Sequence, residues 1–85
     1  MAIDLLYFSW VREAVGTGSE TLDPHAGLVS VSDLVDWLAT LSEGHARAFA
    51  DRARLRAAVD QVFVPLDAPF GRPREVAIFP PVTGG

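Results

Sequence analysis

Apolar residues follow one another closely at the start of the chain. From Ile3 to Trp10 they are mainly aliphatic and aromatic, which predicts a strand. Successive strand side chains point to opposite faces. One face would hold Ile3, Leu5 and Tyr7, and the other Asp4, Leu6 and Phe8. No breaker interrupts the chain before Val15, and residues 16–19 then predict a turn.

The most regular helical pattern begins at residue 31. Its apolar residues fall on one stripe of a helix with 3.6 residues per turn, and they are Val31, Leu34, Val35, Leu38 and Leu41. Ser30 is expected to cap this helix, with Asp33 as a capping-box partner three residues later. Gly44 is expected to end it.

The remaining segments predict short elements. Residues 20–22 read as a short strand, and residues 45–54 favour a second, shorter helix. Residues 55–59 and 62–64 are strand-like around a turn at Asp60-Gln61, residues 67–73 form a loop, and residues 75–79 are the last strand. The expected fold class is therefore α+β: a mixed sheet, one main helix packed across it, a short second helix and an extended C-terminal tail.

Composition limits the classes of function. The 85 residues suit one domain, residues 1–85, and 49% of them are hydrophobic. The net charge of −4 argues against nucleic acid as a partner, and no apolar run is long enough for a membrane span. The absence of cysteine excludes a disulfide framework and a thiolate metal site. Residues 1–4 do not resemble a signal peptide, so we expect a cytoplasmic protein.

The sequence offers little for catalysis within one domain. His25 and His45 lack metal-ligand spacing, so no metal site is expected, and both are interpreted as surface histidines. Residues 16–18 lack the further glycine or lysine of a nucleotide-binding loop. A basic cluster is interpreted as a solvated surface, with docking to an acidic partner or phosphate as the alternative; it consists of Arg47, Arg52, Arg54 and Arg56.

The C-terminal end carries the most informative pattern. Pro80-Pro81 stiffens the base of a segment that ends in Gly84-Gly85. Residues 80–85 are expected to form a flexible reactive tail, and six residues reach roughly 20 Å when extended. Glycines without a Cβ can enter a narrow channel. The terminal carboxylate is a poor electrophile until it is activated, for example as an acyl-adenylate.

Strand alternation also predicts an apolar outer face. If Tyr7, Val62, Val64, Val76 and Ile78 point into the core, then the opposite face holds Leu6, Phe8, Phe63 and Phe79. One helix cannot cover both faces, so these phenylalanines would form a protein interface. The alternative is a shifted register that buries the rings in the core.

Several segments together resemble a known family. They are residues 8–13 with Val15-Gly16, residues 57–61, and residues 75–85 with their Pro-Pro-Val-Thr-Gly-Gly ending. In these segments the chain resembles the small, sulfur-carrier subunits of molybdopterin synthase (MoaD-like), which have a β-grasp, ubiquitin-like fold. The resemblance covers nearly the whole chain.

The resemblance implies a mechanism and partners. An adenylating activating enzyme (MoeB-like) would consume ATP to adenylate Gly85, and a sulfur donor protein would convert the adenylate to a thiocarboxylate. The tail would then enter the molybdopterin synthase large subunit (MoaE-like), where the sulfur passes to cyclic pyranopterin monophosphate. No cofactor would be stably bound.

The same resemblance assigns roles to residues. Gly85 would carry the sulfur and Gly84 would pass the narrow channel. Partner contacts would come from Phe8, Phe63, Phe79, Pro80, Pro81, Val82 and Thr83. The chain would have no catalytic activity alone. The alternatives are a sulfur carrier of another pathway, thiamine or cysteine, and a ubiquitin-like interaction module whose tail is never activated.

Overall fold

The protein folds around one five-stranded mixed sheet. The structure is a computed structural model that describes residues 2–81. The strands are β1 (Ile3–Tyr7), β2 (Ser19–Leu22), β3 (Arg56–Val59), β4 (Val62–Val64) and β5 (Glu75–Phe79). Their order is β2-β1-β5-β3-β4, in which β1 and β5 are parallel and the other pairs are antiparallel. The parallel central pair places the end of β5 beside the end of β1.

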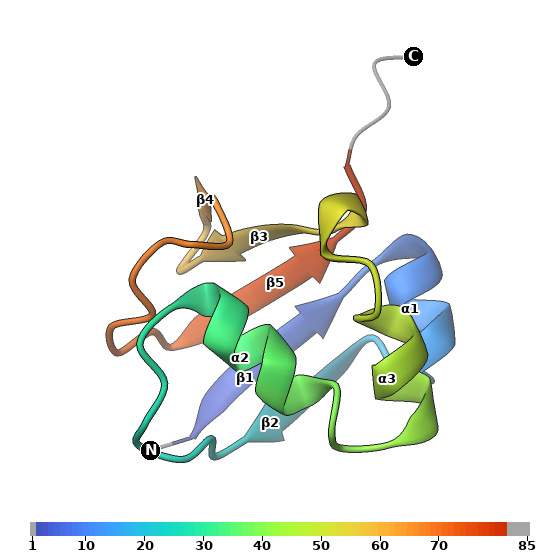
Figure 1. The fold of residues 1–85 in the computed structure, drawn as a ribbon, viewed down its shortest axis with the longest axis horizontal. Coiled ribbons are helices and arrows are strands. Elements are labelled where there is room, and N and C mark those ends of the chain that lie inside the picture. Colours follow the sequence, from blue (N-terminus) through green and yellow to red (C-terminus); the bar gives the residue numbers. More distant parts are fainter. Residues whose placement is uncertain (1, 82–85) are drawn as a thin grey trace.

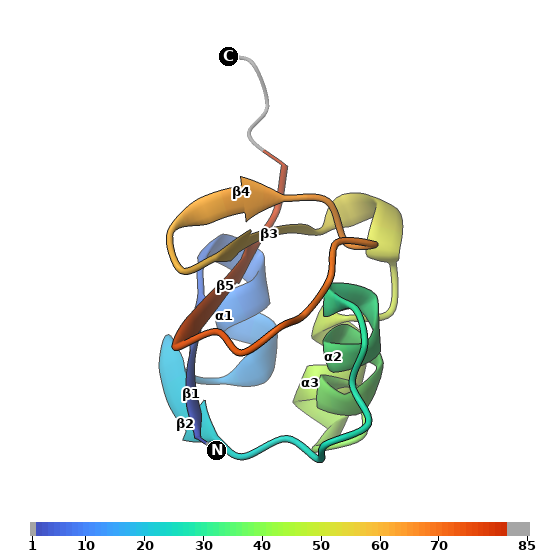
Figure 2. The same ribbon diagram turned by 90° about the vertical axis from the view of Figure 1, so that its left-hand side faces the viewer.

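The helices gather on one face of this sheet. They are α1 (Ser9–Val15), α2 (Val31–Leu38) and α3 (Glu43–Ala48), with a short 3₁₀ helix, η1 (Arg52–Arg54). Figures 1 and 2 show α2 and α3 lying over the sheet on the same side. Fully buried apolar side chains fill the space between, among them Leu5, Leu34, Leu38, Val76 and Ile78. This arrangement confirms the predicted mixed sheet with a main helix across it.

The main helix begins at the predicted cap. The Asp33 backbone N–H donates to Ser30 Oγ at 3.2 Å, and Asp33 Oδ2 accepts from the backbone N–H groups of Val29 at 2.9 Å and Ser30 at 3.1 Å. These backbone bonds stabilise the charged carboxylate and lower the pKa of Asp33. The capping box therefore fixes where α2 starts.

The strand predicted over Ile3 to Trp10 is too long, because α1 begins at Ser9. β1 ends at Tyr7, Phe8 is extended, and Ser9, the first residue of α1, has a φ of 54°. Val11 is buried in the core, and Gly16 ends the helix with a φ of 99° and an N–H bond to the Arg12 carbonyl. The spacing of Val11, Ala14 and Val15 also suits a helix face, and that signal competes with the strand pattern.

The sequence predicts that Gly44 ends the main helix, and this prediction is wrong. α2 stops at Leu38, Leu41 lies beyond it, and Ser42 caps α3 by accepting from the His45 N–H at 3.1 Å. Gly44 is the second residue of α3, where a Cβ would stand 2.4 Å from the Ala14 carbonyl oxygen. The glycine therefore serves the close approach of α3 to α1. The helix predicted over residues 45–54 is correspondingly divided into α3 and η1.

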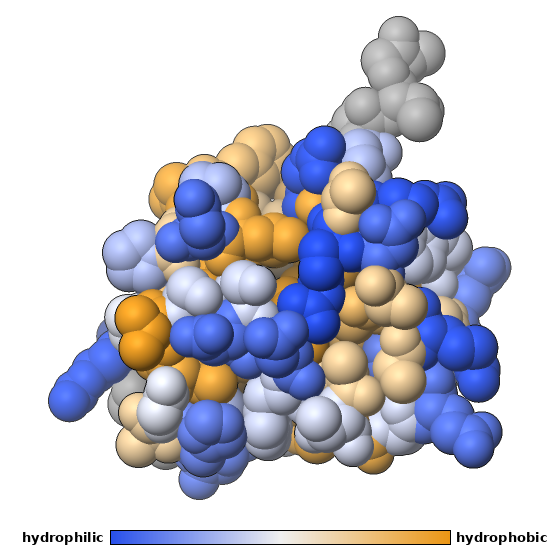
Figure 3. All heavy atoms as spheres, viewed as in Figure 1, coloured by the Kyte–Doolittle hydropathy of each residue, from blue (hydrophilic) through white to orange (hydrophobic). Residues whose placement is uncertain are grey.

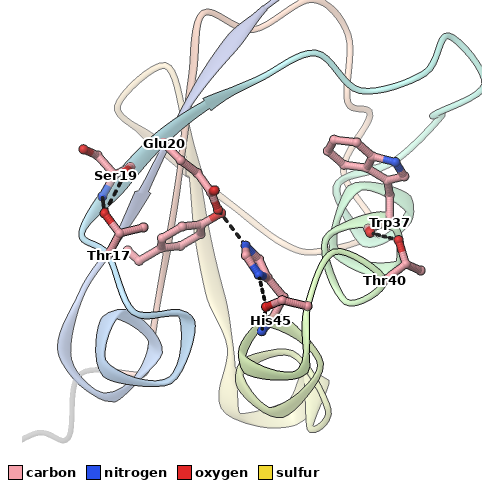
Figure 4. Close-up of polar contacts among 8 residues, drawn as sticks. Thr17, Ser19, Glu20, Trp37, Thr40 and His45 are labelled. Atoms are coloured by element: carbon pink, nitrogen blue, oxygen red, sulfur yellow. Dashed lines mark hydrogen bonds and ion pairs between the residues drawn. The ribbon is translucent and has the colours of Figure 1, made fainter.

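His45 is buried, which corrects its interpretation as a surface residue; His25 is exposed as expected. Figure 4 shows Glu20 of β2 and His45 of α3 pointing toward one another. His45 Nε2 lies 2.7 Å from Glu20 Oε2, and His45 Nδ1 lies 2.7 Å from Ser42 Oγ. The Tyr7 hydroxyl donates to the same Glu20 oxygen at 2.7 Å, and burial together with this carboxylate raises the pKa of Tyr7. These bonds connect β1, β2 and α3.

A tight hairpin joins β3 to β4 at the predicted turn. Asp60 and Gln61 both have positive φ, of 48° and 71°, as a two-residue hairpin turn requires. Asp60 Oδ1 accepts from the backbone N–H groups of Arg74 at 2.8 Å and Glu75 at 3.0 Å, which ties the turn to the start of β5. Val62 was expected in the core but is 62% exposed, because β4 is the edge strand.

The helix side of the molecule has a largely polar surface. Figure 3 shows hydrophilic side chains spread over this face, with smaller hydrophobic areas between them. Within residues 2–81, no helix combines the length and apolar character needed to cross a bilayer.

Candidate functional site

The sheet face opposite the helices carries a row of apolar side chains across four strands. The strand register places Leu6, Ala77, Ala58 and Phe63 side by side. In Figure 2, α2 and α3 lie on the other side of the sheet. Within the described part of the chain, no helix covers this outer face. The alternation predicted from the sequence is therefore confirmed for Leu6, Phe63 and Phe79.

This outer face is hollowed into a groove of about 720 Å³, which we call the outer groove. Its lining residues are Leu6, Phe8, Ser9, Ala58, Gln61, Phe63, Glu75, Ala77, Phe79, Pro80 and Pro81. Ala58 and Ala77 make the floor low because they carry single methyl groups. The rings of Phe63 and Phe79 lie against each other with centroids 5.7 Å apart. The groove is thus an apolar trough with aromatic walls.

Its phenylalanines are exposed to an unusual degree. Phe63 is 82% exposed and Phe8 is 49% exposed, whereas Phe49 in the core is fully buried. Large apolar side chains left open on one contiguous surface mark an interaction site. The structure brings together five of the residues predicted to contact partners: Phe8, Phe63, Phe79, Pro80 and Pro81.

The tail leaves the sheet at this groove. β5 ends at Phe79, and Pro80 and Pro81, the next residues, belong to the groove lining. A protein docked in the groove would therefore lie at the root of the tail. Four of the predicted site residues lie outside the described residues: Val82, Thr83, Gly84 and Gly85.

The chemistry of the groove is that of a docking surface. Of the described residues that line it, Glu75 alone is ionisable. Within residues 2–81, no three His, Asp or Glu side chains gather closely enough to hold a metal ion. Such a surface can bind an apolar partner, but acid–base groups for a reaction would have to come from that partner.

Sequence reasoning missed the residues that shape the groove. Alternation along the last strand predicts that Ala77 shares a face with Phe79, but the sequence does not indicate that Ala77 and Ala58 lie side by side as the groove floor. The sequence groups Arg56 with the basic cluster but does not indicate which face of the sheet it occupies. It is the strand partner of Phe79 and precedes Ala58 on the same face, which alternation along β3 could have revealed.

Comparison with known proteins identifies the family of the chain. The sequence profile of the ThiS family matches residues 5–85. The chain belongs to the ThiS family. It is 42% identical over 83 residues to the molybdopterin synthase sulfur carrier subunit of Escherichia coli, covering 98% of this chain and 99% of that protein. The molybdopterin synthase sulfur carrier subunit of Haemophilus influenzae is 29% identical, with the same coverage.

A solved structure supports the fold in the same way. SAMP1 from Haloferax volcanii has a TM-score of 0.70 to this ThiS-family chain and is 22% identical, with complete coverage of both chains. This likeness, together with the mixed five-stranded sheet, confirms the expected β-grasp, ubiquitin-like fold. The relatives also confirm the resemblance to molybdopterin synthase small subunits.

Proposed function

We propose that this chain is a sulfur carrier of molybdenum cofactor biosynthesis, acting as the small subunit of molybdopterin synthase. One observation carries the proposal: the outer groove and the root of the Gly-Gly tail are the same place on the molecule. The full-length similarity to two sulfur carrier subunits of that enzyme supports it. A groove-bound partner would hold the tail in its own active site.

The proposed chemistry takes place at the Gly85 carboxylate. That carboxylate attacks the α-phosphate of ATP on an adenylating activating enzyme, which releases pyrophosphate and leaves an acyl-adenylate. A sulfide equivalent from a sulfur donor protein then attacks the acyl carbon and displaces AMP, which is a far better leaving group than oxide. The product is a C-terminal thiocarboxylate.

The sulfur is then delivered inside a second partner. The large subunit of molybdopterin synthase would occupy the outer groove and accept the tail, with Gly84 and Gly85 passing a channel that a Cβ would block. The thiocarboxylate sulfur would attack a carbon of cyclic pyranopterin monophosphate, and water would then cleave the bond between that sulfur and the Gly85 carbonyl carbon, which leaves the sulfur on the pyranopterin and regenerates the carboxylate. Phe8, Phe63, Phe79, Pro80 and Pro81 would supply the apolar contacts, Val82 and Thr83 would lie along the channel, and the reaction would take place in the cytoplasm.

Intact mass measurement tests the first half of this proposal. The full chain is incubated with ATP, an activating enzyme of the MoeB type and a sulfur source. We expect a mass gain equal to one sulfur replacing one oxygen, located at Gly85. A chain lacking Gly85 should keep its fold by circular dichroism and gain no sulfur; a truncated chain that still gains sulfur would contradict the site.

Transfer of the sulfur tests the second half. The thiocarboxylated chain, mixed with the large subunit and cyclic pyranopterin monophosphate, should form molybdopterin. Sulfur delivery to a thiamine or cysteine pathway instead would favour a carrier of another pathway. A chain that is never adenylated would favour an interaction module.

A further inference from the structure

Arg56 stands beside the root of the tail, on the outer face. It begins β3 and is the strand partner of Phe79, the last residue of β5. Arg56 also lines a second hollow of about 400 Å³, which shares Phe63 and Phe79 with the outer groove. Arg56 therefore lies at the edge of the groove where β5 leads into Pro80.

The charge of Arg56 is not neutralised within the described structure. Its Nη1 donates to the carbonyl oxygens of Leu55 at 2.8 Å and Ala53 at 3.3 Å, so uncharged groups hold the side chain. Among residues 2–81, no carboxylate lies within 4.0 Å of its guanidinium. The residue is exposed, and a guanidinium has five N–H donors, so donors remain for a partner.

Neighbouring arginines of the basic cluster have different surroundings. Arg52 pairs with Asp36 at 2.6 Å and donates to the Phe49 carbonyl, so it connects η1 to α2 and α3. Arg54 lies over the Trp10 ring, 5.0 Å from its centroid. Arg56 is the member of the cluster that the strand register sets on the outer face.

The opposite end of the groove is acidic. Glu75 lies on the same strand as Phe79, four residues earlier, and lines the groove. Asp4 and Asp60 adjoin it around a hollow that also contains Arg74, so carboxylates are in excess there. Four residues of a strand span roughly 13 Å. This separation exceeds the screening length of about 8 Å at physiological ionic strength, so each end acts locally on a bound protein.

We propose that Arg56 binds a carboxylate of the protein that accepts the tail, and that the two ends of the outer groove set the direction of docking. The proposal rests on the proposed function and adds a partner feature to it: the large subunit presents an acidic side chain beside the channel for the tail. In the reversed direction that carboxylate would face Glu75, and like charges would repel. An apolar trough alone does not distinguish the two directions, whereas charge does.

Binding to the large subunit tests this assignment. The dissociation constant is measured for the wild-type full chain and for Arg56→Glu, Arg56→Ala and Arg47→Glu, at low and at high ionic strength. Arg47→Glu makes the same charge change on the exposed side of α3. We expect Arg56→Glu to weaken binding by about 10-fold or more at low ionic strength, Arg56→Ala to weaken it less, and Arg47→Glu to change it less than about 2-fold.

Ionic strength separates recognition from a structural role. High salt should reduce the difference between Arg56→Glu and Arg56→Ala, because it screens repulsion. The proposal is overturned if the two Arg56 variants bind equally, if Arg47→Glu weakens binding as much as Arg56→Glu, or if the wild-type chain does not bind. In the first two cases, normal sulfur loading of Gly85 would leave the proposed function standing.

Discussion

The two faces of the central strand β5 differ in what they contact. Val76 and Ile78 point under the helices and are fully buried, whereas Ala77 and Phe79 point into the outer groove. The inner side chains hold the sheet to α2 and α3. On the outer side, the small Ala77 is buried at the groove floor and Phe79 is half-buried, and together they leave an apolar trough beside the tail. Neighbouring residues of one strand thus serve stability and docking separately, and substitutions on the two faces should have separable effects.

The largest contrast should come from removing one apolar side chain on each face. Ile78→Ala leaves a cavity in the packed core, and we expect it to lower the free energy of unfolding by about 2–5 kcal/mol. Phe63→Ala removes a ring that is 82% exposed, so its cost should stay within about 0.5 kcal/mol. Urea unfolding of both variants measures the difference. Similar losses would mean that the outer face also stabilises the fold.

A smaller effect should follow from filling the outer groove. Ala77→Leu places a larger side chain at the centre of the groove floor, between Leu6 and Ala58. Because the groove is open, the free energy of unfolding should change little, while a partner that fits the trough meets a steric penalty of about 1–3 kcal/mol. Binding to the large subunit should therefore weaken about 5- to 150-fold.

Ala46→Leu is the matched control for that substitution. Ala46 is exposed on α3, so the same enlargement there should leave binding unchanged. Calorimetric titration of both variants decides the matter. Unimpaired binding of Ala77→Leu would place the docking surface elsewhere on the protein.

Much of this two-sided arrangement could be predicted from the sequence. Alternation of apolar residues predicts β1 and β5 and the phenylalanines of the outer face, and the Ser30 cap predicts the start of α2. These signals are local, so they need no knowledge of distant residues. The Pro-Pro and Gly-Gly pairs are likewise local signals, because the restricted φ of proline and the missing Cβ of glycine are properties of the residues themselves.

Most of the features that the sequence does not predict depend on residues far apart in the chain. Gly44 looks like a helix terminator until α1 is seen against it, with the Ala14 carbonyl in the space of a Cβ. His45 looks like a surface histidine until Glu20 is brought to it from β2. One further feature is local: the strand pattern through Trp10 hides the start of α1, because Ser9 takes a positive φ that its residue type does not predict.

The smallest predicted effect concerns the hydroxyl group on the inner face of β1. Tyr7 is buried and donates to Glu20, and both burial and that carboxylate raise its pKa above the ordinary value of 10.0. Above pH 10 the unfolded chain releases the phenolic proton while the folded chain keeps it. The unfolded state then binds fewer protons, so the free energy of unfolding falls as pH rises, by up to about 1.4 kcal/mol per pH unit.

The composition leaves few other side chains that titrate in the same pH range as Tyr7. The sequence has one tyrosine, no cysteine and no lysine, and arginine stays charged, so Tyr7 is the side chain that titrates between pH 9 and 11 in the unfolded chain. Tyr7→Phe should remove the decline in stability over that range, which urea unfolding at a series of pH values would detect. Tyrosinate absorbance in the folded wild type should appear well above pH 10. A wild-type chain that ionises at pH 10 while folded, or a Tyr7→Phe variant with the same decline, would show that the inner face does not shield this hydroxyl.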